Sequence, residues 1–236
     1  MKYILISCLL LLTSCSSILL PEPQDIEVIS GSYVIEASDG FDILYDSGAT
    51  KMVREYFSSG SIIINGSYFW KTSSAGIIPA WLWIENWIEK YPLRTDDPNL
   101  SHVVIVSGST LEIQWNQEAK ISLASCLLSY SCHAFQAGPL VLSGNTLEPF
   151  SDSWHTSGVY PRTLIGMTRS GKTYFFIFTT PISLHDVWEK IIQDDRFTRD
   201  PLTLLNLDGW PSTAYFDGEQ WFRANEKLPI IIRIKK

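Results

Sequence analysis

The sequence predicts an α+β fold, a mixed, strand-rich single domain with a few helices packed on a mainly antiparallel sheet. Short apolar runs separated by Gly, Ser, Asn or Asp turns dominate the chain, which is typical of strands joined by hairpins. Helical patterns are clear in two segments, and we find no internal repeat or long low-complexity segment. These observations favour one folded domain over residues 30–236.

Residues 1–14 have the features of a bacterial lipoprotein signal peptide. The apolar run Ile4 to Leu12 is too short for a permanent transmembrane helix, which takes about 20 residues. It ends in Leu12-Thr13-Ser14-Cys15, which resembles a lipobox, so we expect cleavage before Cys15 and acylation of that cysteine, palmitate included. Residues 15–29 would then be a lipidated tether. The alternative is an ordinary secretory signal with an incidental cysteine.

The residue after the expected lipidated cysteine bears on the location of the protein, and the charge balance bears on its partners. Ser16 after the expected lipidated cysteine favours anchoring in the outer membrane of the bacterial envelope, facing the periplasm. The whole chain has a net charge of −7, and loss of the positive Lys2 with the signal would make it −8. An acidic surface argues against nucleic acid as a partner. An anionic substrate would have to be bound by local basic groups.

Two cysteines remain in the expected mature domain, Cys126 and Cys132. A pair so close in an exported protein predicts a disulfide, which the loop-entropy model values at about 2 kcal/mol. The alternative is a zinc site, but His133 is the single added ligand nearby and no second cysteine pair exists. We expect no metal and no cofactor.

Strand and hairpin patterns appear in order along the chain. Three hairpins are predicted where a short turn separates two strand-like runs: Ser32–Ala37 with Phe41–Tyr45, His102–Val106 with Thr110–Trp115, and Leu164–Met167 with Thr173–Thr179. Ser61–Ile64 is predicted as a buried strand and Leu228–Ile234 as a closing strand.

Two helices are predicted. Ser183 is a candidate N-cap with Asp186 three residues on, and apolar residues then recur on one face at Leu184, Val187, Trp188, Ile191 and Ile192. Met52–Phe57 is a shorter candidate.

The segment from Lys71 to Ser101 holds a tryptophan-rich stretch. Trp81, Trp83 and Trp87 either stack on sugar rings or pack inside a strand or hairpin. The segment as a whole is a candidate lid or rim over a site.

Four segments place a polar side chain next to a glycine at the end or start of an apolar run: Asn65-Gly66-Ser67-Tyr68-Phe69, Gln136-Ala137-Gly138-Pro139, Arg162-Thr163-Leu164-Ile165-Gly166, and Asn206-Leu207-Asp208-Gly209. Such segments present polar groups to a pocket, although Asp-Gly and Asn-Gly are also ordinary turns.

In this order, and with Ser212 after the last, the four segments resemble the motifs of the phosphodiester glycosidase family over roughly residues 30–236. The resemblance implies hydrolysis of a sugar-1-phosphodiester. By that resemblance Asp208 and Arg162 are catalytic, as carboxylate and phosphate clamp. The implied substrate-binding residues are Asn65, Gly66, Gln136, Gly138, Thr163, Gly209 and Ser212. Backbone amides near Gly66, Gly138 and Gly209 would add donors.

Structural roles stay open for several of these residues. Arg162 could pair with Asp208 or Asp152 as a buried strut, and Gln136 could satisfy backbone groups.

The chain departs from the family pattern at Trp210 and Pro211, which stand where the family has glycines. Proline lacks an N–H, so a phosphate cradle made of backbone amides would be impaired there.

Two classes of function therefore follow from the sequence. The first is an envelope lipoprotein that hydrolyses a carbohydrate phosphodiester or acts on an envelope glycan. The second is a degenerate, non-catalytic lipoprotein that binds glycan or protein on the same fold. In both, the lipid anchor is the link to the membrane.

Overall fold

The computed structural model describes residues 27–29, 31–72, 76–80, 82–86, 88–97, 99–108, 110–149, 154–209, 211–223 and 225–236. The predicted signal peptide, Cys15, Asp152 and Trp210 lie outside the described residues. Within them, no helix is long and apolar enough to cross a bilayer.

The fold is α+β and strand-rich, and every strand pairing in its described part is antiparallel. The largest sheet has seven strands in the order β1 (Glu27–Ile29), β2 (Ser32–Glu36), β15 (Thr173–Ile182), β14 (Tyr160–Thr168), β16 (Leu202–Gly209), β12 (Leu140–Ser143) and β13 (Thr146–Leu147).

Three smaller sheets complete the architecture, where the sequence suggested one main sheet. One has the order β10 (Thr110–Trp115), β9 (His102–Ser107), β11 (Cys132–Ala137), β7 (Trp83–Glu85) and β8 (Ile88–Tyr91). A second has the order β18 (Trp221–Phe222), β17 (Tyr215–Phe216), β4 (Ser61–Asn65), β19 (Ile230–Lys235) and β3 (Phe41–Tyr45). The third pairs β5 (Phe69–Thr72) with β6 (Gly76–Pro79).

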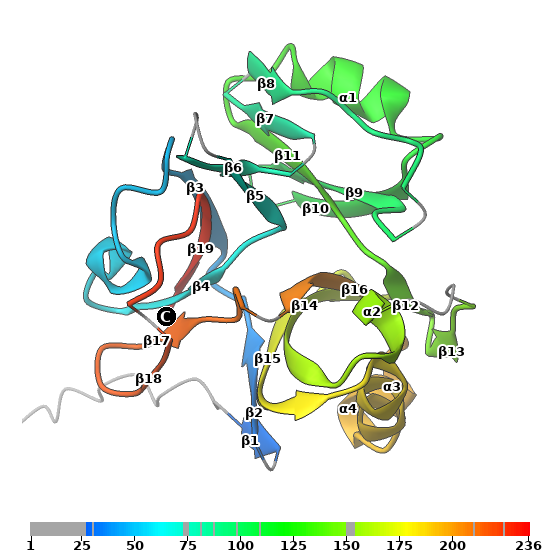
Figure 1. Ribbon diagram of the computed structural model, residues 1–236. Helices are drawn as coiled ribbons and strands as arrows, with labels where there is room; N and C mark the ends of the chain where they lie inside the picture. Colours follow the sequence, from blue (N-terminus) through cyan, green and yellow to red (C-terminus); the bar gives the residue numbers. More distant parts are fainter. Residues whose placement is uncertain are drawn as a thin grey trace, which may run out of the picture.

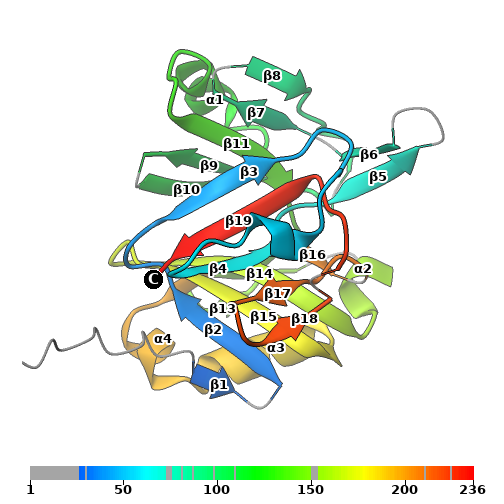
Figure 2. The same cartoon turned by 90° about the vertical axis from the view of Figure 1, so that its left-hand side faces the viewer.

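The helices are short and lie on the outside. They are the 3-10 helix η1 (Val53–Tyr56), α1 (Lys120–Cys126), α2 (Trp154–Ser157), α3 (Leu184–Ile192) and α4 (Asp195–Arg199). Figures 1 and 2 show α1 on the β10-β9-β11-β7-β8 sheet at one end of the molecule and α3 with α4 below the seven-stranded sheet at the other, with the β4-β19-β3 sheet between.

The main core lies where the three large sheets meet. Successive residues of the long strands point to opposite faces. Ile165, Phe175 and Leu205 face this central core together with Trp83, Val104 and Ile64 of the other two sheets. Their neighbours Leu164, Phe176 and Leu204 face the layer under α3 and α4. Because the central strands are buried on both faces, polar groups at their ends are held on a rigid frame.

Most of the element predictions are confirmed. The hairpins β9–β10 and β14–β15 form as expected, and so do the buried strand β4 and the closing strand β19. Ser183 caps α3 and accepts a hydrogen bond from the Asp186 amide at 3.1 Å. The short helix predicted at Met52–Phe57 is the 3-10 helix η1.

The first predicted hairpin is wrong. β2 and β3 are both strands, but β2 pairs with β15 in one sheet and β3 pairs with β19 in another. The turn that includes Gly40, with φ +86°, is therefore a corner between two sheets. The local turn pattern was correct, but long-range pairing decided the partners.

The disulfide between Cys126 and Cys132 is present, with a Cα–Cα distance of 5.2 Å. It joins the end of α1 to the start of β11.

The tryptophan-rich stretch is described only in part. Trp83 is fully buried in the central core, whereas Trp81 and Trp87 lie outside the described residues. Trp83 is therefore a packing residue.

Candidate functional site

The four motifs meet at strand ends contributed by all three large sheets. Asn65 ends β4, Gln136 lies near the end of β11, Arg162 lies near the start of β14, and Asp208 lies near the end of β16. Thr163 is paired with Asp208 across the β14–β16 ladder, and a bulge between this pair and the next leaves Leu207 as the extra residue. Bulges re-aim side chains at the ends of strands. The sequence predicted these strand ends, but not that three sheets would supply them.

Asn65 joins β4 to β14 and to the segment after β16. Its Oδ1 accepts hydrogen bonds from the Thr163 hydroxyl at 2.6 Å and from the Ala214 amide at 3.1 Å. Both Asn65 and Thr163 are buried. The polar atoms of these two predicted substrate-binding side chains thus form hydrogen bonds within the protein, which link β4 to β14 at the site.

Tyr68 and Asn206 form a second connection. The Tyr68 hydroxyl donates to the Gly138 carbonyl at 2.8 Å and accepts from Asn206 Nδ2 at 2.6 Å. The Gly138 amide in turn donates to the Asn206 carbonyl at 2.9 Å. Burial raises the pKa of Tyr68, and the nearby Asp208 charge raises it further. Tyr68 is therefore a neutral hydrogen-bonding group beside the candidate carboxylate.

Asp208 is the carboxylate at the centre of this arrangement. Its side chain is buried, with 6% of the residue exposed. Burial raises the pKa of Asp208 to about 7, although hydrogen bonds from Ser212 and from the Gly209 amide (2.6 Å) and the charge of Arg162 all lower it. A carboxyl with a pKa near neutrality is half ionised at the pH where most enzymes work, which is a recurrent property of catalytic acids and bases.

Arg162 is a buried cation beside Asp208. Its Nη2 donates to the Gly158 carbonyl at 2.7 Å, and its guanidinium lies 5.4 Å from the Tyr160 ring centre. Arg162 and Asp208 influence each other electrostatically, but no direct salt bridge between these two described side chains joins them. Nη1 has no hydrogen-bond partner among the described residues. The buried-strut interpretation with Asp208 is therefore not what the structure shows, and the Nη1 edge of Arg162 forms no hydrogen bond within the described part of the chain.

Gln136 holds the loop between β8 and β9. Its Oε1 accepts from the Arg94 amide at 3.0 Å, and its Nε2 donates to the Leu100 carbonyl at 2.9 Å and to the Arg94 carbonyl. A Cβ at Gly138 would collide with the backbone of Asn99 to Ser101, so only glycine lets this loop pack against the strand end. All the described hydrogen bonds of the Gln136 side chain therefore go to backbone groups, as in the structural interpretation of this residue.

The same loop brings a second acid toward the site. Asp97 lies close enough to Tyr68 to raise its pKa. The segment Lys71–Ser101 was expected as a lid or rim, and its part from Arg94 to Ser101 does border the motifs. No sequence pattern points to Asp97, because it lies in an irregular loop whose position depends on Gln136.

The three glycine amides expected as ligand donors are already used. Gly66 N donates to the Ile230 carbonyl at 2.9 Å, Gly138 N to Asn206, and Gly209 N to Asp208. After Gly209 the chain turns, and the Gly209 carbonyl accepts from the Ser212 amide at 2.7 Å. In this structure the N–H groups of Gly66, Gly138 and Gly209 are therefore not directed at a ligand, and side chains are the better candidates for phosphate binding.

Two buried polar atoms beside Asp208 lack a protein partner in the described part of the chain. They are Asn206 Oδ1 and Thr213 Oγ1, both in residues with no exposed surface. A buried polar atom without a partner is costly, so such atoms point to a bound group or water. Sequence reasoning did not select Tyr68, Asn206 or Thr213 as site residues. The alternation of β16 places Asn206 on the same face as Asp208, and that was the available signal for Asn206.

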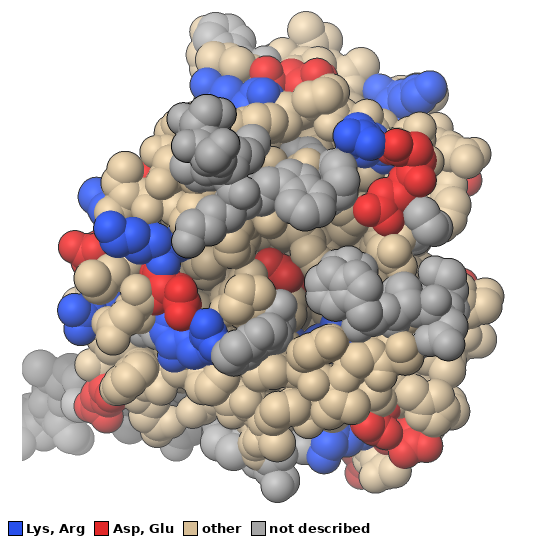
Figure 3. All heavy atoms as spheres, viewed as in Figure 1, with Lys and Arg blue, Asp and Glu red and all other residues tan. Residues whose placement is uncertain are grey.

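The surface is hollowed in this region. Figure 3 shows a depression in the middle of the face, with an acidic group on its floor, close to β14 and β16 in Figure 1. Acidic groups with one basic group gather on its rim, over the loop between β8 and β9.

A metal site is not evident beside Asp208 among the described residues. The described residues that could jointly hold an ion are His185, Asp186 and Glu189 on the exposed face of α3. They lie on the far side of the seven-stranded sheet from the β4 strand end.

Comparison with known proteins identifies the family. The family model for phosphodiester glycosidase matches residues 58–229, which is most of the chain. No curated protein matches the sequence. The fold is similar to that of the zebrafish N-acetylglucosamine-1-phosphodiester alpha-N-acetylglucosaminidase catalytic domain auto-inhibited by pro-peptide, with a TM-score of 0.58 and 13% identity over 87% of this chain and 76% of that one.

A hypothetical protein from Synechocystis matches with a TM-score of 0.49 and 11% identity, over 89% of this chain and 61% of that one. The structural likeness establishes the fold, and the family model establishes membership. The chain belongs to the phosphodiester glycosidase family.

Proposed function

We propose that this protein hydrolyses the bond between the anomeric carbon of a sugar and the oxygen of a phosphodiester. The observation that carries the proposal is the buried Asp208 carboxyl, with a pKa raised to about 7, beside buried Arg162, whose Nη1 has no partner among the described residues. Family membership supports the same reaction.

The reaction suits a site with one central carboxylate. Hydrolysis breaks the C1–O bond, forms a new bond from C1 to the oxygen of water, and releases a phosphate monoester that takes up the electron pair of the broken bond. The water loses a proton to solvent or to a basic group. Because a phosphate monoester is a stable anion, the leaving group needs less protonation than an ordinary alkoxide. Ionised Asp208 would stabilise positive charge developing at C1.

Arg162 is proposed to bind the phosphoryl oxygens. A guanidinium offers directed N–H donors that match phosphate geometry, and burial strengthens the interaction because water competes less. The Nη1 edge lies against Gly209, since a Cβ there would be 3.7 Å from Nη1. Phosphate bound to this edge would sit next to Asp208, which is where the scissile bond must be.

Asn206 and Thr213 are proposed to bind the sugar. Asn206 Oδ1 accepts hydrogen bonds and Thr213 Oγ1 can donate or accept, and neither atom has a partner among the described residues. Sugar hydroxyls or an acetamido N–H would satisfy them. A substrate that lacked such donors would leave buried polar groups unpaired, which makes this pair a source of specificity.

We also propose that the protein is a lipid-anchored protein of the bacterial cell envelope, with Cys15 as the acylated residue. The lipobox-like Leu12 to Cys15 and the short apolar run before it support this. Mass spectrometry of membrane-extracted protein should find an N-terminal lipid-modified Cys15, and an unmodified product with a different N-terminus would contradict the proposal.

The function is tested with methyl diesters of glucose, galactose, mannose and N-acetylglucosamine 1-phosphate in ¹⁸O-labelled water. Cleavage of the C1–O bond puts the label in the sugar and releases methyl phosphate. Cleavage of a P–O bond would put the label in phosphate and indicate a phosphodiesterase instead. If none of these diesters is turned over by the wild type, the non-catalytic glycan- or protein-binding alternative is favoured.

A further inference from the structure

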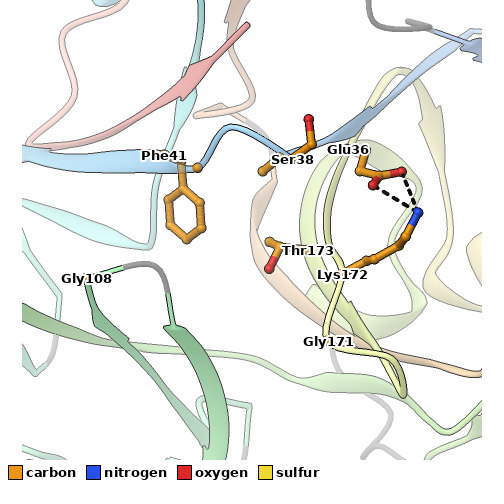
Figure 4. A pocket seen from close by; sticks show the side chains of 9 residues that line it. Glu36, Ser38, Phe41, Gly108, Gly171, Lys172 and Thr173 are labelled. Carbon is orange, nitrogen blue, oxygen red and sulfur yellow. Dashed lines mark hydrogen bonds and ion pairs between the residues drawn. The ribbon is translucent and has the colours of Figure 1, made fainter.

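A second cavity lies at the other end of the sheets, where three turns meet. Its volume is about 340 Å³, and its walls come from the β2–β3 corner, the β9–β10 turn and the β14–β15 turn. Figure 4 shows the Phe41 ring between the Gly108 turn and Thr173, with the Glu36–Lys172 ion pair beyond Thr173. We propose that this cavity binds a neutral sugar ring. The proposal does not rest on the hydrolytic function.

The cavity is open because glycines line it. Gly40, Gly108 and Gly171 have φ values of +86°, +60° and +89°, and a Cβ on any of them would meet no atom within 4 Å. Three tight turns that converge therefore leave a space that no side chain of the described residues fills. The volume lies at the lower end of the range for small-ligand pockets and suits one or two sugar rings.

Phe41 supplies a fixed apolar surface. Its ring is half-buried and packs edge-on against Phe175, with ring centres 5.1 Å apart and an interplanar angle of 82°. A ring held in this way loses little conformational entropy when a ligand stacks on it. The apolar C–H face of a sugar pairs well with such an aromatic surface.

The polar wall carries both charges but no net charge. Lys172 Nζ lies 3.1 Å from Glu36 Oε1, and the Tyr174 hydroxyl donates to Glu36 Oε2 at 2.8 Å. Since each charge is already paired, the wall attracts neither a free anion nor a free cation strongly. Paired carboxylate and ammonium groups can still exchange hydrogen bonds with hydroxyls, and Ser38 and Thr173 add hydroxyls of their own.

The cavity is separate from the Asp208 site. Both use β14, but Arg162 lies near the start of this strand and Thr168 at its end leads into the turn that carries Gly171. Six residues of strand separate these points by roughly 20 Å. One sugar ring cannot occupy both places, so the cavity would hold either a distant part of an extended glycan or a different glycan.

The proposal is tested by NMR titration of ¹⁵N-labelled protein with three neutral trisaccharides: maltotriose, cellotriose and N,N′,N″-triacetylchitotriose, each up to about 10 mM. At least one should shift the amide signals of residues 36–41, 108 and 171–173. Gly108→Asn fills the cavity at a left-handed position that asparagine tolerates. Gly144→Asn, at φ +56° and with equally open space, is the matched control.

We expect Gly108→Asn to weaken binding at least about tenfold and Gly144→Asn to leave it unchanged. Phe41→Leu should also weaken binding, while Phe57→Leu, which removes another half-buried ring in an edge-on pair at 5.1 Å, should not. Asp208→Asn should keep this binding intact even where hydrolysis is lost. The proposal is overturned if no trisaccharide binds, if the shifts cluster around Asp208, or if Gly108→Asn binds like the wild type.

Discussion

The guanidinium of Arg162 lies against Gly209, the residue that follows Asp208. A Cβ at Gly209 would come within 3.6 Å of Arg162 Cδ and 3.1 Å of the Pro161 carbonyl oxygen. The Pro161 contact is the tight one, so glycine at this position lets the end of β16 pack against the backbone of β14, with the Arg162 side chain in van der Waals reach. Arg162 and Asp208 also influence each other's pKa, although they form no direct salt bridge within the described part of the chain.

Asp208→Asn should abolish most hydrolysis without unfolding the protein. The substitution keeps the shape of the side chain. It removes the negative charge of the carboxylate and its ability to take up and release a proton. Loss of such a group costs roughly 100- to 10,000-fold in rate. Initial rates on the most active sugar-1-phosphodiester would measure the loss. Asp195→Asn, at a carboxylate whose side chain is 86% exposed, is the control and should keep wild-type activity. Comparable losses of activity in the two variants would show that Asp208 has no specific catalytic role.

The pH dependence of kcat/KM should report the titration of Asp208. If the ionised carboxylate is the active form, activity rises with pH through about 7, where Asp208 loses its proton. The Arg162 charge lowers this pKa, so Arg162→Met should move the inflection to higher pH as well as reduce the rate. A profile that is flat between pH 5 and 9, or an inflection that does not move in the variant, would contradict this assignment.

Asp208 should also lower the stability of the fold above neutral pH. Its pKa is raised on folding, so the folded protein holds the proton more tightly than the unfolded chain. Stability is then greatest below the unfolded pKa of 3.8 and is lost progressively as pH rises to about 7. A rise of this size corresponds to roughly 4 kcal/mol at most.

Asp208→Asn removes that titration, so the variant should be more stable than the wild type at pH 8, and the difference should shrink toward pH 4. Thermal melts at several pH values would measure it. A variant that is less stable than the wild type at every pH would indicate that Asp208 is a structural carboxylate and not a strained functional one.

Thr163→Val should destabilise the junction between β4 and β14. It removes the 2.6 Å hydrogen bond to Asn65 Oδ1 in a buried site, which is expected to cost about 1–3 kcal/mol. Thr163→Ser keeps the hydroxyl and should lose much less. Urea unfolding curves would separate the two. If Thr163 instead binds substrate directly, the valine variant would raise KM with little change in stability.

The sequence predicted the strand ends but not their long-range relationships. Motifs such as Asn65-Gly66 and Asp208-Gly209 mark where apolar strands stop, and this is local information. Pairing of β2 with β15 and of β3 with β19 depends on contacts more than 100 residues apart, so the Gly40 turn was wrongly predicted as a hairpin. The roles of Asn65 and Gln136 were obscured for the same reason. Their partners are backbone and side-chain groups that only the folded chain brings together.

Gln136 provides the sharpest test of a positioning role against direct substrate binding. Gln136→Glu is nearly isosteric, but it replaces the Nε2 donor that serves the carbonyls of Arg94 and Leu100 with an acceptor. Facing acceptors repel, so the β8–β9 loop should detach and carry Asp97 away from Tyr68. Hydrogen exchange at residues 94–101 should therefore increase strongly, while exchange in β14 and β16 stays slow.

The control is Gln193→Glu at the exposed end of α3, which should leave exchange in the loop unchanged. A substrate-contacting Gln136 would behave differently, since its loss would raise KM while the loop stayed protected. Because the Gln136 side chain bonds only to backbone groups within the described residues, we expect opening of the loop to come first. Any change in KM should then track the fraction of protein in which the loop is open, and lower pH, which protonates the introduced carboxyl and restores a donor, should partly reverse both effects.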